Sequence, residues 1–124
     1  MKNNFDPHLP IYLQMMDEIK KNIFNKTYLP GKKIPSVREL ALQYSINPNT
    51  IQKSLIELER EGFLRSERAV GRFVTEDQNL INQLRKQHAQ SKIKDFIQEM
   101  YAFGYDDHDI LSTLKEELHD QGGS

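Results

Sequence analysis

The stretch SVRELALQYSINPNTIQKSLIELEREG, residues 36–62, contains two short amphipathic segments separated by the turn-forming sequence Ser45-Ile46-Asn47. In both segments, apolar residues recur at the spacing of one face of an α-helix. We therefore expect helices at 36–44 and 48–61, with residues 45–47 as the turn between them. Two helices joined by so short a turn form a helix-turn-helix, and this motif decides the fold.

Each helix of the motif begins with its own capping signal. Ser36 and Glu39 match a capping box, in which the serine side chain accepts a hydrogen bond from the backbone and the glutamate reaches back to the serine N–H. Asn47 is the expected N-cap of the next helix, and Pro48 suits its first position. Gly62 predicts the end of that helix.

One further helix is expected before the motif. Pro10 is tolerated at a first helical position, and the turn at Pro30-Gly31 predicts an end near Thr27. Its apolar stripe consists of Tyr12, Met15, Met16, Ile19 and Ile23. Such a stripe is typical of a helix with one buried face.

A β-hairpin is expected after the motif, with strands at 63–66 and 72–75 and a loop in which Gly71 is available for a positive φ. Three helices and a hairpin form a winged helix-turn-helix, which we place at residues 10–76. The predicted fold class is mainly α: a winged helix-turn-helix with a small β-hairpin, followed by a two-helix dimerisation tail at residues 77–120.

The outward face of the helix at 48–61 carries the residue types that contact DNA. In a helix-turn-helix the second helix enters the major groove with its N-terminal residues nearest the base edges. Asn49 can pair with adenine, and Lys53 can reach guanine or a phosphate. Thr50 and Gln52 can bond phosphates or bases. A merely solvated helix would also be polar here, so the residue types of the first turn favour the DNA interpretation.

Two residues close to this face have a second interpretation. Asn47 is expected to cap the helix rather than to contact a base. Ile56 either packs beneath the hairpin or contacts a thymine methyl group.

Arginines outside this helix are candidates for the DNA backbone. Arg38 is expected to clamp a phosphate, since a guanidinium binds phosphate in a bidentate manner. The alternative is a surface ion pair with Glu39 or Glu59. In the hairpin, the candidate backbone contacts are Arg65, Arg68 and Arg72, with Gly71 allowing close approach. The alternative is a simply solvated hairpin.

These motifs resemble those of the GntR family of bacterial transcription regulators. The run GKKIPSVRELA at 31–41 is similar to the family pattern G-x-x-L-P-S-x-R-x-L-A. The segment INPNTIQK at 46–53 is similar to V-x-x-x-T-V-x-x, and LEREGFL with GRFV matches the family's later motifs. The NPNT form and the short tail resemble the YtrA subfamily, whose C-terminal part is two helices used for dimerisation.

The resemblance implies a DNA-binding regulator. It implies DNA contacts at Arg38, Asn49, Thr50, Gln52 and Gly71. Many members have arginine where this chain has Pro48 and Gln52, so no operator sequence is carried over. The resemblance to the family also suggests that the protein controls transporter genes.

The tail carries apolar side chains that need a partner. We expect its interface with a second copy of the chain to consist of Leu80, Leu84, Ile93, Phe96, Ile97, Met100, Leu111 and Leu114. A small-molecule effector could bind at the aromatic residues Tyr101, Phe103 and Tyr105. Alternatively, the acidic tail only limits sliding on DNA.

Composition and charge exclude other classes of protein. With 124 residues there is no room for a large cofactor domain, and the absence of cysteine removes disulfides and thiol catalysis. Residues 1–75 hold 12 Lys and Arg against 8 Asp and Glu, whereas residues 76–124 hold 5 against 10. The chain has no apolar run of membrane-spanning length and no secretory signal pattern, so we expect a cytoplasmic protein.

No pattern of an enzyme or a metal site is present in the sequence. It has no glycine-rich phosphate loop and no nucleophile elbow, and His88, His108 and His119 lack the spacing of metal ligands. We therefore expect a sequence-specific transcription regulator without a cofactor, acting as a repressor on a two-fold symmetric operator as a homodimer. The alternative is a winged-helix module that binds proteins and has lost DNA binding.

Overall fold

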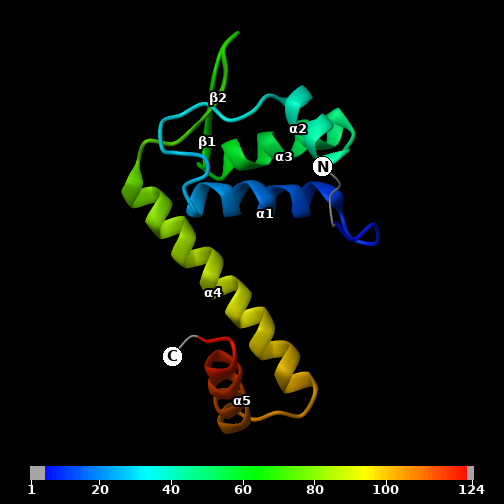
Figure 1. The fold of residues 1–124 in the computed structure, drawn as a ribbon, viewed down its shortest axis with the longest axis vertical. Coiled ribbons are helices and arrows are strands. Elements are labelled where there is room, and N and C mark those ends of the chain that lie inside the picture. Colours follow the sequence, from blue (N-terminus) through cyan, green and yellow to red (C-terminus); the bar gives the residue numbers. More distant parts are fainter. Residues whose placement is uncertain (1–4, 123–124) are drawn as a thin grey trace. The chain divides into compact units, whose positions relative to one another are not determined.

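The computed structural model of the protein describes residues 5–122. Its elements are α1 (Ile11–Phe24), α2 (Val37–Tyr44), α3 (Pro48–Arg60), β1 (Leu64–Glu67), β2 (Gly71–Val74), α4 (Gln78–Ala102) and α5 (Asp107–Asp120) (Figure 1). The predicted fold class, mainly α with one antiparallel hairpin, is confirmed. Contacts divide the chain into two compact units, and the division falls after Gln83 within α4.

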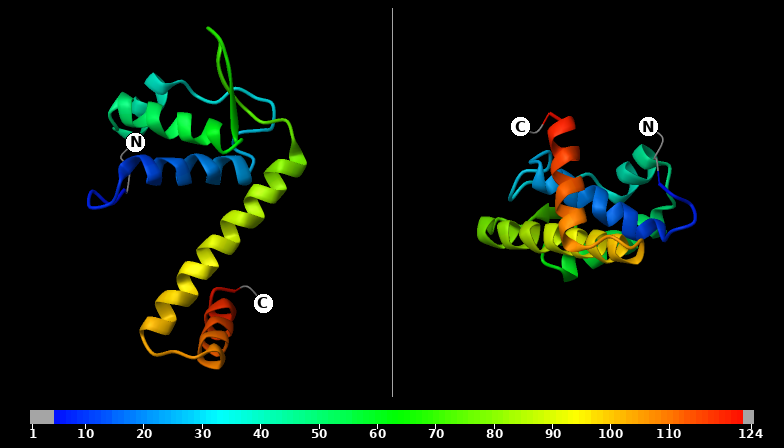
Figure 2. Two further views of the ribbon diagram at one scale, coloured as in Figure 1. Left: turned by 180° about the vertical axis from the view of Figure 1, so that it is seen from behind. Right: turned by 90° about the horizontal axis from the view of Figure 1, so that it is seen from below.

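The core of the first unit lies between α1, α2, α3 and the hairpin. Two views show α1 and α3 lying side by side (Figures 1 and 2). The two helices run in the same direction, because Tyr12 in the first turn of α1 contacts Ser54 in the middle of α3, and Lys20, further along α1, contacts Glu61 just after the end of α3. The fully buried apolar side chains of this unit include Phe63, Met15, Ile19, Ile23, Leu40, Ile51, Leu55, Leu58 and Val74.

The predicted stripe of α1 is buried except for Tyr12, which is half-buried. The helix ends at Phe24 rather than near Thr27. Lys26 has a φ of 65°, a left-handed conformation that cannot continue a right-handed helix. The turn signal at Pro30-Gly31 therefore lies beyond the actual end of the helix.

Both capping predictions in the helix-turn-helix are confirmed. The Ser36 hydroxyl accepts from the Glu39 N–H at 3.1 Å, and the Ser36 N–H donates to the Glu39 carboxylate at 2.9 Å. The Asn47 side chain accepts from the Asn49 N–H at 2.8 Å, with Pro48 at the first helical position. These caps hold the beginnings of α2 and α3 in place.

The hairpin differs by one residue from the predicted strands. Glu67 pairs with Gly71, so the strands continue further toward the tip than expected, and only residues 68–70 form the turn. Ala69 in this turn has a φ of 64°, a conformation that glycine adopts more readily. At the other edge, Lys33 forms a bridge with Phe73, which attaches the segment before α2 to the hairpin.

The first unit includes the beginning of α4, beyond the boundary expected at residue 76. Ile81 is 4% exposed, and Leu80 lies against Gly62 at the end of α3. The carboxylate of Asp77 accepts from the Leu80 N–H at 3.0 Å, which caps this end of α4.

The second unit comprises the remainder of α4 and α5. Gly104, with a φ of 87°, follows α4, and Asp106 caps α5 through a capping box with Asp109. Ile110, at 8% exposed, is the only buried residue among the described residues of this unit. No helix among residues 5–122 combines the length and the apolar character needed to cross a bilayer.

Candidate nucleic-acid interface

The beginning of α3 presents a polar surface. Asn49, Gln52 and Lys53 are exposed, while Thr50 is half-buried. Asn47 is exposed, but its side-chain oxygen is occupied by the Asn49 N–H, in agreement with a capping role. Since Ile51, Leu55 and Leu58 are buried, the helix has one face in the core and these polar side chains away from it.

Ile56 continues this surface toward the middle of α3. Its side chain is 43% exposed, so it is not covered by the hairpin. Ile56 follows Asn49 by seven residues and Lys53 by three, so the three residues lie on the same face of the helix. An apolar side chain there can contact a thymine methyl group.

Arg38 lies in the first turn of α2 and is exposed. It forms no ion pair within residues 5–122, and both acidic residues considered as partners are occupied elsewhere. Glu39 accepts the Ser36 backbone N–H, a hydrogen bond that lowers the pKa of its carboxyl group. Glu59 accepts from Ser66 and Arg72. The guanidinium of Arg38 is therefore available for a phosphate.

A notch of about 320 Å³ lies between the segment before α2, α3 and the hairpin. Its lining includes the cationic residues Lys33, Arg38 and Arg72, together with Gly71. Gly71 has a φ of 141°, and a Cβ atom there would lie 2.7 Å from Cε of Lys33. A residue with a side chain at this position would have a strained backbone and would displace the Lys33 side chain. Glycine avoids both effects and leaves the notch open.

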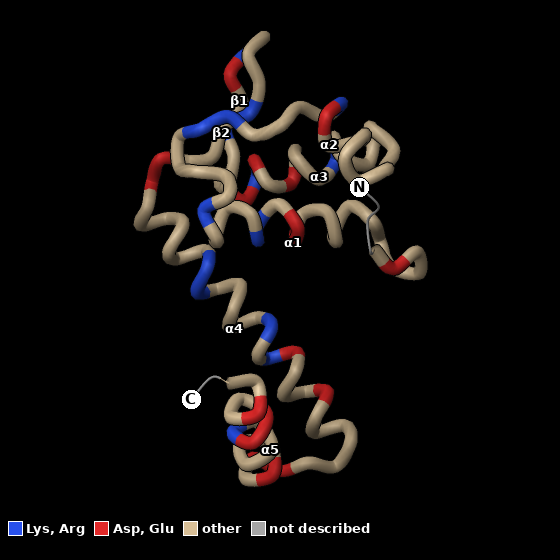
Figure 3. Tube along the Cα trace, in the orientation of Figure 1, with Lys and Arg blue, Asp and Glu red and all other residues tan. Residues whose placement is uncertain are grey.

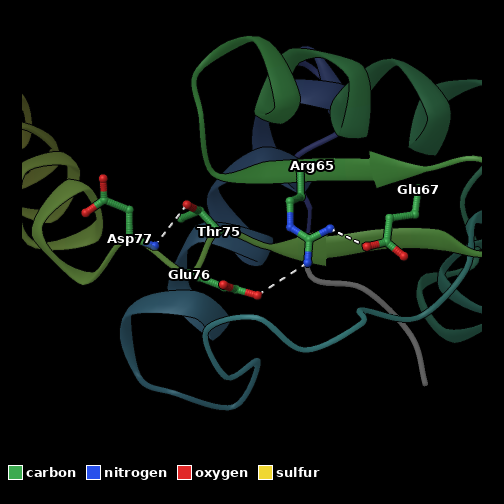
Figure 4. A network of polar contacts seen from close by, with 5 residues as sticks. All are labelled: Arg65, Glu67, Thr75, Glu76 and Asp77. Carbon is green, nitrogen blue, oxygen red and sulfur yellow. Dashed lines mark hydrogen bonds and ion pairs between the residues drawn. The ribbon is translucent and has the colours of Figure 1, made fainter.

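The hairpin arginines have different surroundings. Arg68 is exposed in the turn and forms no ion pair within the described part of the chain. Arg65 contacts the carboxylate of Glu67 at 2.6 Å and that of Glu76 at 3.5 Å (Figure 4). Its guanidinium also lies over the Phe73 ring. The hydrogen bond to Glu67 is the main cause of the raised pKa of Arg65.

Arg72 is directed into the protein rather than away from it. Its Nε donates to Glu59 of α3, and its side chain is 17% exposed. Ser66 of the opposite strand donates its hydroxyl hydrogen to the same carboxylate oxygen at 2.6 Å. Glu59 thus connects both strands of the hairpin to α3, a role that its sequence position alone does not reveal.

Lys53 contacts an aromatic ring from α1. Its ammonium nitrogen lies 3.9 Å from the centroid of the Tyr12 ring. The neighbouring Ser54 hydroxyl donates to the Tyr12 carbonyl oxygen at 2.9 Å and to that of Thr50 at 3.0 Å. The sequence pattern places Tyr12 only in the apolar stripe of α1, and no sequence signal links two residues so far apart in the chain.

Charge along the first unit is mixed rather than uniformly basic (Figure 3). In the part of the chain that the structure describes, no three His, Asp or Glu side chains gather as a metal-binding group. The features that could bind a nucleic acid are therefore the polar start of α3, Arg38, the cationic notch and the turn of the hairpin.

This arrangement of helices and hairpin matches a known family. The model of the bacterial regulatory proteins of the gntR family matches residues 11–74, from the start of α1 to the end of β2. The chain belongs to the GntR family. The matched segment contains each of the features just named.

Similar curated proteins come from Bacillus subtilis. The uncharacterized HTH-type transcriptional regulator YhcF is 36% identical over 93% of this GntR-family chain and 95% of its own length. The HTH-type transcriptional repressor YtrA is 43% identical over 55% of this chain and 52% of its own length. Both are regulators of transcription, and the chain is not an enzyme. The YtrA match agrees with the resemblance to that subfamily.

Two solved structures extend the comparison. A GntR family transcriptional regulator from Listeria monocytogenes has a TM-score of 0.84 and 38% identity, covering 90% of this chain and 98% of its own. The DNA-binding domain of AraR, solved in complex with its operator, has a TM-score of 0.56 and 33% identity over 60% of this chain and 95% of its own. The family therefore includes regulators that bind operator DNA through a domain of this fold.

Proposed function

We propose that this chain is a sequence-specific transcription regulator that binds a two-fold symmetric operator as a homodimer and represses by blocking access to the promoter. The observation that carries the proposal is the exposed polar start of α3 together with the exposed Arg38, whose guanidinium has no ion-pair partner among residues 5–122. The operator complex of the AraR DNA-binding domain supports it, because that domain has the same fold. The similar protein YtrA is named a transcriptional repressor, which supports repression rather than activation.

Each proposed contact follows from the position of its side chain. Asn49, with Thr50 and Gln52 beside it, faces the base edges, and Arg38 binds the backbone. Arg68 binds the backbone from the hairpin turn, and Gly71 lets the chain approach closely. Arg72 supports the hairpin through Glu59 rather than adding a separate phosphate contact.

The homodimer is inferred from the second unit, taken by itself. It exposes large apolar side chains on both helices, with Ile93 at 56%, Leu111 at 54% and Leu118 at 54% exposed. A groove of about 490 Å³ between α4 and α5 is lined mainly by apolar residues, including Phe96, Ile97, Ile110 and Leu114. Apolar surface of this kind is stabilised by covering it, and a second copy supplies a matching face.

The expected interface and effector residues do not all lie along this groove. Ile93, Phe96, Ile97, Leu111 and Leu114 line it, as does Tyr101 of the proposed effector site. Leu80 lies in the first unit against Gly62, so we leave it out of the proposed interface.

The proposed function also implies a location. An operator-binding repressor acts where the chromosome is, which in a bacterium is the cytoplasm.

DNA selection and sedimentation together test the proposal. The full chain is used to enrich duplexes from a random-sequence pool at low salt, and its affinity for the selected duplex is measured at several salt concentrations. We expect inverted repeats, an affinity that falls steeply with salt, and a dimer at micromolar concentration. Absence of binding at low salt would instead favour the protein-binding module, and a monomer would refute the homodimer.

A further inference from the structure

The contact between Lys53 and Tyr12 places the lysine at the side of α3 rather than along its outward face. The ammonium lies 3.9 Å from the centroid of a ring that belongs to α1. A cation at this distance over a phenol ring is attracted by the ring's negative face. The side chain that could extend from α3 toward a guanine is therefore held toward α1.

The position of Tyr12 is fixed independently of this contact. Its carbonyl oxygen accepts from the buried Ser54 hydroxyl at 2.9 Å, which ties the first turn of α1 to α3. The ring is half-buried, and its hydroxyl group forms no hydrogen bond within residues 5–122. Tyr12 thus offers an aromatic face to the ammonium from a backbone that is tied to α3, and a hydroxyl group that is open to a further acceptor.

We propose that Tyr12 belongs to the DNA interface as the positioning residue of Lys53, so that the ammonium and the Tyr12 hydroxyl bind one backbone phosphate beside α3 and neither contacts a base. This inference rests on the proposed DNA-binding function. Sequence preference then belongs to Asn49, Thr50 and Gln52, and Lys53 contributes affinity for any duplex.

The physical reason is the direction of the side chain. In this docking mode, α3 enters the groove and the elements beside it lie over the phosphates. A residue of α3 that is held toward α1 is therefore directed to the backbone. An ammonium group acts on a phosphate as a point charge and needs no bidentate geometry, so partial shielding by the ring leaves this contact possible.

The chain contains a matched control for this pair. Lys20 of α1 lies 5.3 Å from the centroid of the Phe63 ring and forms an ion pair with Glu61 at 3.1 Å. This is a second contact of lysine with an aromatic ring between α1 and the end of α3, away from the helix beginnings. Lys20→Ala therefore removes the same charge and the same type of contact outside the proposed interface.

The experiment measures binding of the full chain to a duplex selected by the wild type and to an unrelated duplex of equal length, over a range of salt. Lys53→Ala is expected to weaken both complexes by a similar factor and to reduce the salt slope by about one. Tyr12→Phe keeps the ring and is expected to lose only the hydroxyl contribution. Tyr12→Leu is expected to weaken binding in the wild-type background more than in Lys53→Ala, because the two side chains act together.

Several outcomes would overturn the inference. If Lys53→Ala changes the preferred base at one position, Lys53 contacts a base. If Tyr12→Phe and Tyr12→Leu bind both duplexes as the wild type does, Tyr12 is outside the interface. Thermal unfolding shows whether a variant is folded, and Tyr12→Phe, with its ring retained, keeps the test decisive if Tyr12→Leu does not fold. If the wild type itself binds no duplex at low salt, it is the proposed function that fails.

Discussion

Arg72 of the hairpin donates its Nε to the carboxylate of Glu59 in α3, which connects the wing to the helix that carries the candidate DNA contacts. Ser66 binds the same carboxylate from the other strand. Partial burial by itself would raise the pKa of Glu59, but the hydrogen bonds from Ser66 and Arg72, with the Arg72 charge, outweigh burial and lower it. Glu59 therefore joins both strands of the wing to α3, in addition to the backbone bridge between Lys33 and Phe73.

Removing the charge of Glu59 is expected to loosen the wing. Glu59→Gln should lower the free energy of unfolding by about 1 kcal/mol, because it weakens two charge-assisted hydrogen bonds. DNA affinity should fall although Glu59 contacts no DNA. Because its pKa in the folded protein is below the ordinary 4.5, the stabilisation from Glu59 is present above that pH and is lost as the pH falls below it. Urea unfolding at several pH values checks this. If Glu59→Gln lost as much free energy of unfolding at acid pH as the wild type, the prediction would be contradicted.

Arg38 is expected to contribute affinity without sequence preference. Arg38→Ala should weaken binding to selected and unrelated duplexes alike and lower the salt slope by about one. Asn49→Ala should instead weaken only the selected duplex, by about 1–3 kcal/mol, since it removes a base contact. Arg60→Ala is the control, because Arg60 is paired with Glu57 at the other end of α3. A change of base preference in Arg38→Ala would argue against a phosphate contact.

A charge in the groove of the second unit is expected to separate the dimer. Leu111 lines this groove and is 54% exposed in the single chain. In Leu111→Glu, dimerisation would require burying an unpaired carboxylate, which is costly. Sedimentation should show a monomer, whereas Leu42→Glu, at a 73% exposed position of α2, should remain a dimer. Equal dimerisation of both variants would place the interface elsewhere.

The hairpin turn contains a residue in an unfavourable conformation. Ala69 has a φ of 64°, which a side chain disfavours and glycine adopts freely. Ala69→Gly should therefore raise the free energy of unfolding by about 0.5–1 kcal/mol. Ala41→Gly within α2 should lower it by about 1 kcal/mol, because glycine is unfavourable inside a helix. Thermal unfolding of both variants measures the two opposite signs, and destabilisation by Ala69→Gly would refute the strain.

Local signals in the sequence predicted the beginnings of α2 and α3 and the buried face of α1. Ser36 with Glu39, and Asn47 before Pro48, predicted the beginnings of α2 and α3 because capping involves residues only a few positions apart. The buried stripe of α1 was predicted for the same reason, since helical periodicity is a local property. The end of α1 was missed, because a left-handed φ at Lys26 has no reliable signature in its residue type.

The order of the elements, the family and the polar start of α3 can all be predicted from the amino-acid sequence. The contacts of the cationic side chains depend on the three-dimensional arrangement. Arg72 is paired with Glu59 and Arg65 with Glu67, Lys53 lies over Tyr12, and Arg38 has no ion-pair partner among residues 5–122. The physical reason is distance along the chain. A cap or an apolar stripe is set by neighbours within one or two helical turns, whereas an ion pair or a ring contact depends on which distant segments the core brings together.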